Sequence, residues 1–343
     1  MLRSLYSGIS GMKVNQTKLD VIGNNLANVS TTAFKGSRVN FSTTISQTLG
    51  SASAASDSLG GVNGKQVGLG AQIASIDKIM SQGSMQSTSR SLDVAVDGSG
   101  YFMVAAGPAL TGDAKDSITI VNNGVGTMPS NSSVAYTRDG SFVLDNEGNL
   151  LTSKGYRVLG FAMQTTDPVN GGNIDNIEND GKVLYVESNN QTKAIDDKLV
   201  SLKIPDKVIK VDAKGKRTDV AVKSFNISAD GLITGVLETG EITALGQIAM
   251  SSFKNEVGLT DIGNNMYEPS GSSGSAIISS GKNSANRTSS GYGDILQGYL
   301  EMSGVDMAEQ FTDMIVATKA FQAAGKTITT GDEILSEIIN LKR

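Results

Sequence analysis

The sequence contains no histidine, no cysteine and no tryptophan, and only five of its 343 residues are proline. Without imidazole or thiol groups, the chain cannot build disulfides, zinc sites, iron–sulfur clusters, haem ligated by His or Cys, or Ser-His and Cys-His nucleophiles. These absences exclude many classes of enzyme. Carboxylate pairs for acid/base catalysis stay open, but no feature of the sequence singles one out, and we expect no catalytic residues, no metal and no cofactor. The lack of cysteine fits either redox compartment, so it does not decide the location of the protein.

Net charge and hydropathy indicate which kinds of partner the protein is not built to bind. The net charge is −5, from 29 basic and 34 acidic residues, which argues against binding to a nucleic-acid phosphate backbone. The sequence has no run of about 18 apolar residues that could span a bilayer. Its start, MLRSLYSGISGMKV, lacks the apolar core of a cleaved signal peptide. We expect neither nucleic-acid binding nor membrane insertion.

Both ends of the chain carry apolar residues at alternating steps of three and four, which is the pattern of coiled-coil helices. Ser303 and Asp306 are candidate capping residues for the second helix, and Lys342 and Arg343 would suit the negative end of its macrodipole. Small and polar residues interrupt both patterns. The residues predicted to form this helix seam and to contact neighbouring subunits are Leu5, Ile9, Met12, Leu19, Leu26, Met307, Phe311, Met314, Phe321, Ile328, Leu335 and Ile339.

Two arrangements of these terminal helices are open. Each helix could pack on the core of its own domain, as most amphipathic helices do. Alternatively the two ends pair, because residues 1–67 carry six basic and two acidic side chains whereas 301–343 carry four basic and seven acidic ones. Residues 42–70 are rich in Ser, Gly and Ala and are typical of a flexible tether. A helix on such a tether need not pack on its own subunit.

The middle of the chain has the pattern of β-structure. Apolar and polar residues alternate in runs such as 92–96 and 208–211, and no helical pattern lies between the runs. Pairs that favour tight turns separate them. These pairs are Asn63-Gly64, Asp97-Gly98, Asn123-Gly124, Asp139-Gly140, Asp180-Gly181 and Asp230-Gly231. We expect a mainly β protein with long terminal α-helices, its β domains resembling sandwiches or barrels.

Two Ser-x-x-Lys runs have the spacing of Ser/Lys acylases. They begin at Ser10 and Ser251, with lysines at Lys13 and Lys254. The further Ser-Asp-Asn and Lys-Thr-Gly elements of such enzymes are absent, and Ser10 lies inside the helical pattern. Coincidence explains these runs better than catalysis does.

Other motif fragments are also explained by chance. Gly325-Lys326-Thr327 imitates the end of a phosphate-binding loop, but Ala320 stands where the first glycine must be. The acidic turn at 145–148 lacks the spacing of a calcium-binding EF-hand loop. Asn-x-Ser/Thr sequons occur in a chain that is rich in these residues and has no signal peptide. They begin at Asn15, Asn28, Asn131, Asn190, Asn226 and Asn286.

Four blocks of sequence, in the same order along the chain, resemble the flagellar rod and hook axial proteins. They are LDVIGNNLANVSTTAFK at 19–35, LDVAVDGSGYF at 92–102, YTRDGSF with GNL at 136–150, and the C-terminal run from 303 to 343. Ala33 stands where the family usually has glycine, and Gly304 where it usually has asparagine. The family signature residues are Asn24, Asn25, Asn28, Phe34, Lys35 and Asp306.

The resemblance implies nested domains and a structural, non-enzymatic role. Its inner helical domain would comprise 1–30 and 304–343, followed by the Ser/Gly-rich tether at 31–70. An inner β domain would comprise 71–160 and 223–303, and 161–222 would form a small outer β domain. The resemblance also implies export through the type III apparatus of the flagellum without a cleaved signal, to an extracellular place in the hook and basal body.

Within this family, the central segment 161–222 and the ending Ile339-Asn340-Leu341-Lys342-Arg343 favour a hook type. Such a subunit would assemble with itself into a flexible, curved helical tube that transmits torque from rod to filament. Its other partners, by resemblance, would be the distal rod protein, the hook cap and the hook–filament junction proteins. The alternative in the same family is a distal rod subunit. The alternative of another class is a secreted β-rich adhesin, for which the aromatic content of 5% is low.

Overall fold

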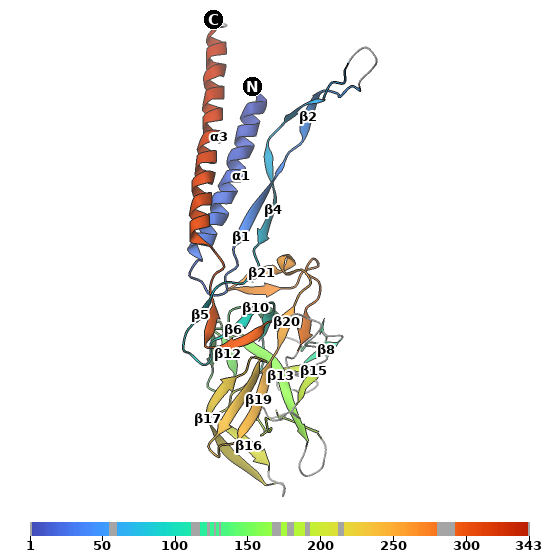
Figure 1. The fold of residues 1–343 in the computed structure, drawn as a ribbon, viewed down its shortest axis with the longest axis vertical. Helices are drawn as coiled ribbons and strands as arrows, with labels where there is room; N and C mark the ends of the chain where they lie inside the picture. The colour runs from blue at the N-terminus through green and yellow to red at the C-terminus, as the bar shows by residue number, and fades with distance from the viewer. Residues whose placement is uncertain are drawn as a thin grey trace. The chain divides into compact units, whose positions relative to one another are not determined.

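The computed structural model describes residues 2–54, 60–110, 117–121, 124–126, 128–129, 132–166, 173–176, 182–188, 193–211, 216–279 and 292–341. It consists of two compact units. Unit 1 comprises Met1–Ser81 and Ser303–Arg343, and unit 2 comprises Gln82–Met302. Strands dominate, with one long helix near each end of the chain (Figure 1), so the predicted fold class is confirmed. The predicted turn residues Asn123 and Asp180 and the cationic pair Lys342 and Arg343 lie outside the described residues.

Two antiparallel helices form one side of unit 1. Helix α1 spans Leu2–Ala27 and helix α3 spans Met307–Leu341, and they lie side by side in Figure 1. Near the start of α3, Asn25 Nδ2 donates to Gln310 Oε1 at 3.0 Å, and Lys18 pairs with Asp313 at 3.3 Å. Residue numbers therefore rise along α1 as they fall along α3, as expected for antiparallel neighbours.

The helix boundaries are set by local chemistry. Asp306 Oδ1 accepts hydrogen bonds from the amides of Ala308 at 2.8 Å and Glu309 at 3.3 Å, so Asp306 caps α3. Ser303 does not share this task, because its hydroxyl accepts from Val305 instead. After α1, Ala33 has φ 55°, a left-handed conformation that explains the glycine usual at this position of the family.

Residues 37–54 and 60–78 contain antiparallel strands that lie beside α1, and we call these described residues the arm (Figure 1). Its strands are β1 (Ser37–Thr43), β2 (Ser46–Gly50), β3 (Lys65–Gly68) and β4 (Ala71–Lys78). The segment 31–70, predicted to be a flexible tether, thus contains three of these strands, β1, β2 and β3. The physical reason is cross-strand pairing of apolar residues, such as Val39 with Ile76 and Phe41 with Ile73. Serine and threonine do not prevent this pairing.

Unit 2 is built from short antiparallel strands around β7 and β13. Strand β7 (Tyr101–Ala106) pairs with β10, β13 and β20, and β13 (Arg157–Thr166) also pairs with β14, β15 and β19. Two small ladders, β5 with β25 and β6 with β24, join the beginning of the unit to its end. The unit is therefore closed by pairing between residues far apart in the sequence.

The remaining elements of unit 2 complete these ladders. They are β5 (Met85–Ser87), β6 (Val94–Asp97), β8 (Ile118–Val121), β9 (Gly124–Val125), β10 (Ser133–Thr137), β11 (Phe142–Leu144), β12 (Leu150–Thr152), β14 (Asn173–Asp175), β15 (Lys193–Ser201), β16 (Lys207–Val211), β17 (Arg217–Ile227), β18 (Leu232–Leu237), β19 (Ile242–Ile248), β20 (Met250–Ser252), η1 (Glu256–Gly258), β21 (Thr260–Gly263), β22 (Met266–Glu268), β23 (Ile277–Ser279), β24 (Asp294–Gln297) and β25 (Tyr299–Glu301).

The segment 161–222, predicted to be a separate outer domain, shares the hydrophobic core of unit 2. Its Leu202 and Val208 are buried in one cluster with Val94 and Phe102 from the predicted inner domain. A buried asparagine also ties the segment in, because Asn176 Oδ1 accepts from the Met163 amide and Asn176 Nδ2 donates to the Leu245 carbonyl. The division predicted from the sequence therefore differs from the two observed units, because non-local burial joins the segment to its surroundings.

We predict that Asn176→Ala destabilises unit 2. The substitution leaves the Met163 amide and the Leu245 carbonyl without their buried partner, at about 1–3 kcal/mol for each unsatisfied group. Urea unfolding of the purified chain measures this loss. The control is Asn146→Ala at an exposed position, where a change within about 0.5 kcal/mol is expected. Equal stability of the two variants would refute the role assigned to Asn176.

A paired glycine experiment tests the helix contact in unit 1. A Cβ at Gly8 would lie 2.7 Å from Thr327 Oγ1 and 3.2 Å from Ile328 Cγ1, so Gly8→Ala must push the helices apart. Overpacking of this kind costs about 1–3 kcal/mol. Gly23 in the same helix is exposed with no atom within 4 Å, so Gly23→Ala should stabilise α1 by about 0.5–1 kcal/mol. The melting temperature of the helices, followed by circular dichroism, should therefore fall for Gly8→Ala and rise for Gly23→Ala. A change in the same direction for both variants would contradict the close contact.

Candidate assembly interface

Helix α3 keeps most of its large apolar side chains exposed. Only Ala317 and Gly331, both small, are fully buried along its length. Phe311 is 48% exposed and Ile315 is 61% exposed, although each would normally be covered in a folded chain. The exposed large apolar residues of α3 are Met307, Phe311, Ile315, Val316, Phe321, Ile334, Ile338, Ile339 and Leu341.

These exposed residues lie on two sides of the contact with α1. Met307, Phe311 and Ile315 follow one another at steps of four, which places them on one stripe of the helix. Ile334 and Ile338 form a second stripe nearer the C-terminus. A single partner helix covers one sector of α3, so both stripes remain in solvent among the described residues. We call them the α3 stripes.

The residues predicted for the helix seam divide between the contact and the solvent. Those that are half-buried are Leu5, Met12, Leu19, Leu26, Met314, Ile328 and Leu335. Those that are exposed are Ile9, Met307, Phe311, Phe321 and Ile339. The predicted pattern thus contains both the intramolecular contact and part of the uncovered surface.

Small residues at the contact were missed by the sequence reasoning. Gly8 is buried and lies close to Thr327, while Gly331 is buried against Leu5, whose Cδ2 would be 2.9 Å from an added Cβ. The sequence feature that could have identified this contact is glycine within an otherwise helical pattern. Such a glycine can mark a place where two backbones approach closely. A search for large apolar residues alone could not find it.

The signature residues of the first block hold the base of the arm to the helices. Asn25 is buried, and its side chain donates to the Ser37 carbonyl at 2.8 Å and accepts from the Ser37 amide at 2.9 Å. The Asn25 side-chain nitrogen also donates to Gln310 Oε1 in α3, so this one side chain joins α1, β1 and α3. Asn28 Nδ2 donates to the carbonyl and side-chain oxygens of Asn24, which closes the end of α1.

The remaining signature residues act at the same junction. Lys35 is only 2% exposed, and its ammonium donates to the Ser81 carbonyl at 2.9 Å. Phe34 is half-buried and its carbonyl accepts from the Gly304 amide at 3.2 Å. Asp306 caps α3. These side chains position the elements of unit 1, and none of them is arranged for chemistry.

The arm carries a second uncovered apolar surface. It is held to α1 at Gly70, where φ is +134° and a Cβ would lie 2.2 Å from Ser10 Oγ. Thr44 donates to the Gly70 carbonyl through both its amide and its hydroxyl, at 3.0 Å each. The exposed large apolar residues of this arm surface, with one residue just beyond β4, are Phe41, Ile45, Leu49, Val62, Val67, Leu69, Ile73, Ile76 and Ile79.

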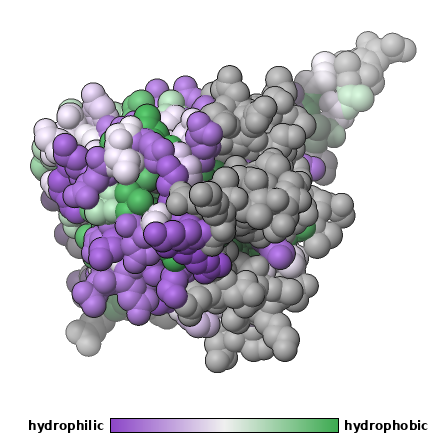
Figure 2. All heavy atoms as spheres, turned by 90° about the horizontal axis from the view of Figure 1, so that it is seen from below, coloured by the Kyte–Doolittle hydropathy of each residue, from purple (hydrophilic) through white to green (hydrophobic). Residues whose placement is uncertain are grey.

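Unit 2 presents a different surface. Figure 2 shows one face on which the described residues are mostly hydrophilic, with small hydrophobic areas between them. Its largest apolar side chains, including Tyr101, Phe102 and Phe161, are fully buried. Among the described residues, most of the exposed large apolar side chains therefore lie in unit 1.

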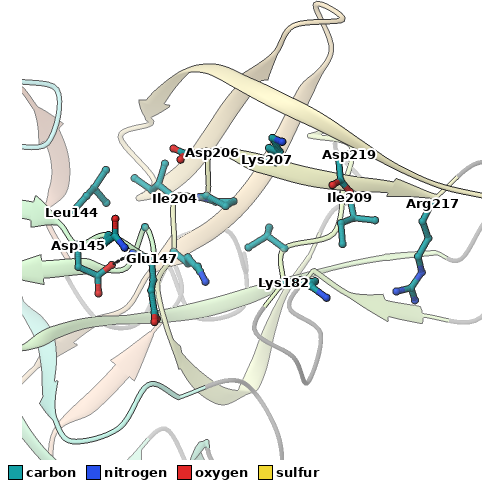
Figure 3. Close-up of a pocket in the computed structure, with 15 residues that line it drawn as sticks. Leu144, Asp145, Glu147, Lys182, Ile204, Asp206, Lys207, Ile209, Arg217 and Asp219 are labelled. Carbon is teal, nitrogen blue, oxygen red and sulfur yellow. Dashed lines mark hydrogen bonds between the residues drawn. The ribbon is translucent and has the colours of Figure 1, made fainter.

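A cavity of about 770 Å³ among the described residues of unit 2 is a candidate for a ligand site (Figure 3). Lysines and an arginine share its wall with four carboxylates, and Lys207, Arg217 and Asp219 are exposed. The lining residues are Leu144, Asp145, Asn146, Glu147, Gly148, Lys182, Val183, Lys203, Ile204, Pro205, Asp206, Lys207, Ile209, Arg217 and Asp219. Charges of both signs in an open, wet cavity favour no single ligand.

The acidic turn in this cavity serves its own backbone. Asp145 Oδ1 accepts from the amides of Glu147 at 2.9 Å and Asn149 at 2.8 Å, and Asp145 Oδ2 accepts from Asn149 Nδ2. Burial acts to raise the pKa of Asp145, but these hydrogen bonds outweigh it and hold the pKa below its ordinary value. No group of three or more acidic side chains in the described chain is placed to hold a metal ion.

The two serines with Ser-x-x-Lys spacing are used within the fold. Ser10 donates to the Ser7 carbonyl at 2.8 Å and accepts from the Ala71 amide. Ser251 is fully buried and donates to the Tyr101 carbonyl at 3.3 Å, while Lys254 is exposed. Neither arrangement activates a nucleophile. None of the helices in the described ranges is long and apolar enough to cross a membrane.

Three family models match segments of the chain. The model described as "Flagella basal body rod protein" matches residues 5–35, and "Flagellar hook protein FlgE/F/G D1 domain" matches 125–235. The model "Flagellar basal body rod FlgEFG protein C-terminal" matches residues 296–341. The terminal matches include most of the two helices of unit 1, and the central match includes the whole of the segment 161–222. The descriptions name structural parts of the flagellum.

Similar proteins cover the whole chain. The flagellar basal-body rod protein FlgG of Bacillus subtilis is 43% identical over 344 residues, which is 100% of both chains. The flagellar hook protein FlgE of Borreliella burgdorferi is 30% identical over 448 residues, also 100% of both chains. A solved structure, the Helicobacter pylori flagellar hook protein FlgE2, covers 63% of this chain and 100% of that one, with 12% identity and a TM-score of 0.39. On the full-length identities, this chain belongs to the flagellar rod and hook axial protein family, whose members form parts of the flagellum.

Proposed function

We propose that this chain polymerises with copies of itself, through unit 1, into a helical tube of the flagellar axis. The observation that carries the proposal is the apolar surface that the chain leaves uncovered on α3 and the arm. Burying one large apolar side chain contributes about 1.5–3 kcal/mol. Several such side chains on each copy would offset the entropy lost when subunits associate.

The chemistry of this surface favours an open polymer over a closed pair. The α3 stripes and the arm surface are different in kind, one helical and one β, so contact between a stripe of one copy and the arm of another is heterologous. Contacts of this kind form a ring where the rotation between copies closes and a helical filament where it does not, and the proposal is the filament. The described residues on the face in Figure 2 are mostly hydrophilic, which suits continued exposure to water.

For the type of tube, the hook is our first candidate. The sequence features that suggest it are the segment 161–222, whose β14, β15 and β16 enlarge unit 2, and the ending Ile339-Asn340-Leu341-Lys342-Arg343. A rod protein that aligns over 100% of both chains also has residues opposite this segment, so the segment alone does not separate the two candidates. A hook subunit would meet the distal rod protein, the hook cap and the hook–filament junction proteins at the ends of its tube. Export without a cleaved signal, an extracellular place and a non-enzymatic role follow from the same resemblance.

The distal rod is the second candidate. The relative named a basal-body rod protein is 43% identical over 344 residues, so this chain has nearly a residue for every aligned position. The alignment with the hook protein runs over 448 residues although this chain has 343, so that hook protein has segments without counterparts here. This observation favours the rod.

Electron microscopy of the concentrated, purified chain separates the candidates. Curved tubes whose curvature varies along their length support the hook, and straight tubes support the distal rod. Absence of polymer, in a sample whose unit 2 is folded by circular dichroism, would contradict the proposal in either form.

We predict that Phe311→Ala weakens assembly without unfolding the monomer. Phe311 is 48% exposed in the free chain, so truncating it there removes little buried apolar surface. In the polymer the same side chain would be covered by a neighbouring copy, so truncation removes more buried surface. The loss of about 1–2 kcal/mol per subunit should raise the critical concentration roughly five- to thirtyfold. Sedimentation at a series of concentrations measures it.

Thr312→Ala is the matched control, because Thr312 is exposed in the same turn of the helix and does not fall on the steps of four that define the α3 stripes. Its critical concentration should stay close to that of the unmodified chain. Thermal unfolding of the monomer should be similar for all three proteins. If Phe311→Ala lowers the melting temperature sharply and leaves assembly unchanged, Phe311 packs within its own subunit and the proposed surface is wrong.

A further inference from the structure

Asn63-Gly64 is a turn motif that the structure does not use as a hairpin turn. The pair follows an isolated bridge between Ser53 and Val62 and precedes strand β3. Gly64 does not adopt the positive φ that a two-residue turn of this type requires, unlike Gly98 and Gly231 in the predicted pairs of unit 2. A tight turn therefore does not fix the backbone of Asn63 and Gly64.

Both residues are open to water and loosely held. Asn63 and Gly64 are exposed, and their neighbour Val62 is 57% exposed. Among the described residues, no hydrogen bond holds the Asn63 side chain or the Gly64 amide. The nearest atoms to a Cβ built at Gly64 are the Ala52 amide and the Gly50 carbonyl, at 3.5 Å, so nothing crowds this backbone.

We propose that Asn63 is a site of spontaneous deamidation in the arm. The Gly64 backbone nitrogen attacks Asn63 Cγ, a new N–Cγ bond forms, and the Cγ–Nδ2 bond breaks with release of ammonia. The Gly64 nitrogen gives up its proton in this step, and the product is a cyclic succinimide. Water then opens the ring at either carbonyl and leaves aspartate or isoaspartate. One water is consumed and one ammonia is released, and no oxidant or reductant is needed.

Glycine is what permits the attack at this position. Because Gly64 has no Cβ, its amide nitrogen can approach the side-chain carbonyl carbon with little steric hindrance. Helical Asn24 lacks this opportunity, because its side-chain oxygen accepts from Asn28 and its backbone is fixed in α1. Asn146 is exposed but is followed by Glu147 in a turn tied to Asp145.

The reaction would change the arm surface. It replaces a neutral amide by a carboxylate beside Val62, within a surface rich in exposed apolar side chains. Isoaspartate also adds one methylene to the main chain next to β3, which disturbs the register of β3 against β2. This consequence rests on the proposed function, since it matters only where the arm is covered by another copy.

Peptide mapping by mass spectrometry tests the chemistry without assembly. The full chain is incubated, unassembled, at neutral to mildly alkaline pH, and the peptide containing Asn63 is followed over time. We expect progressive conversion to the aspartate and isoaspartate forms, loss of this conversion in Gly64→Ala, and no comparable conversion at Asn146. An Asn63 that stays intact while a short peptide of the same sequence converts would overturn the proposal.

A second measurement tests the consequence separately. Asn63→Asp introduces the charge directly and Asn63→Gln keeps a neutral amide, so sedimentation of the two isolates the effect of charge. We expect a several-fold rise in critical concentration for Asn63→Asp alone. Equal assembly of both variants would overturn the effect on the arm surface. If the unmodified chain itself fails to polymerise, the proposed function fails while the peptide mapping still decides the chemistry.

Discussion

The close antiparallel contact between α1 and α3 is the constraint on which unit 1 depends. Glycines at 8 and 331 let the helices approach, with Thr327 and Leu5 filling the space that a Cβ would need. Such a contact is narrow, because small residues bring backbones together without covering the flanks of either helix. The large apolar side chains of α3 therefore remain on the surface. The same geometry that stabilises the monomer leaves the surface that we propose to be covered in a polymer.

A set of polar residues at the base of unit 1 makes this arrangement specific. Asn25 bonds both to β1 and to α3, Asp306 caps α3, and Lys35 is held by the Ser81 carbonyl. Burying an amide or an ammonium is costly unless it is hydrogen-bonded. These side chains therefore allow the helices and the arm to meet in one geometry. Their role explains why the recognisable blocks of the sequence carry no catalytic groups.

The sequence predicted the features that depend on local pattern. Heptad spacing predicted the terminal helices, and alternation predicted the β-rich middle. The pair Ser303 and Asp306 predicted the start of α3, although only Asp306 caps it. Prediction from the sequence failed where non-local pairing decides the structure. Ser42 and Thr48, within the predicted tether, lie in strands that pair with β4 and β3, opposite Gln72 and Gln66. It likewise could not show that Asn176 and Leu202 join the segment 161–222 to the core of unit 2, because their partners are distant in the sequence.

The central claim is that apolar surface left open by one copy is covered by another. Hydrogen–deuterium exchange on the free chain and on the assembled polymer tests it most directly. The account predicts strong new protection in peptides covering 37–78 and 307–341, with little change in the core strands β7 and β13 of unit 2. Protection confined to unit 2, with the arm and α3 exchanging as fast in the polymer as in the free chain, would contradict it.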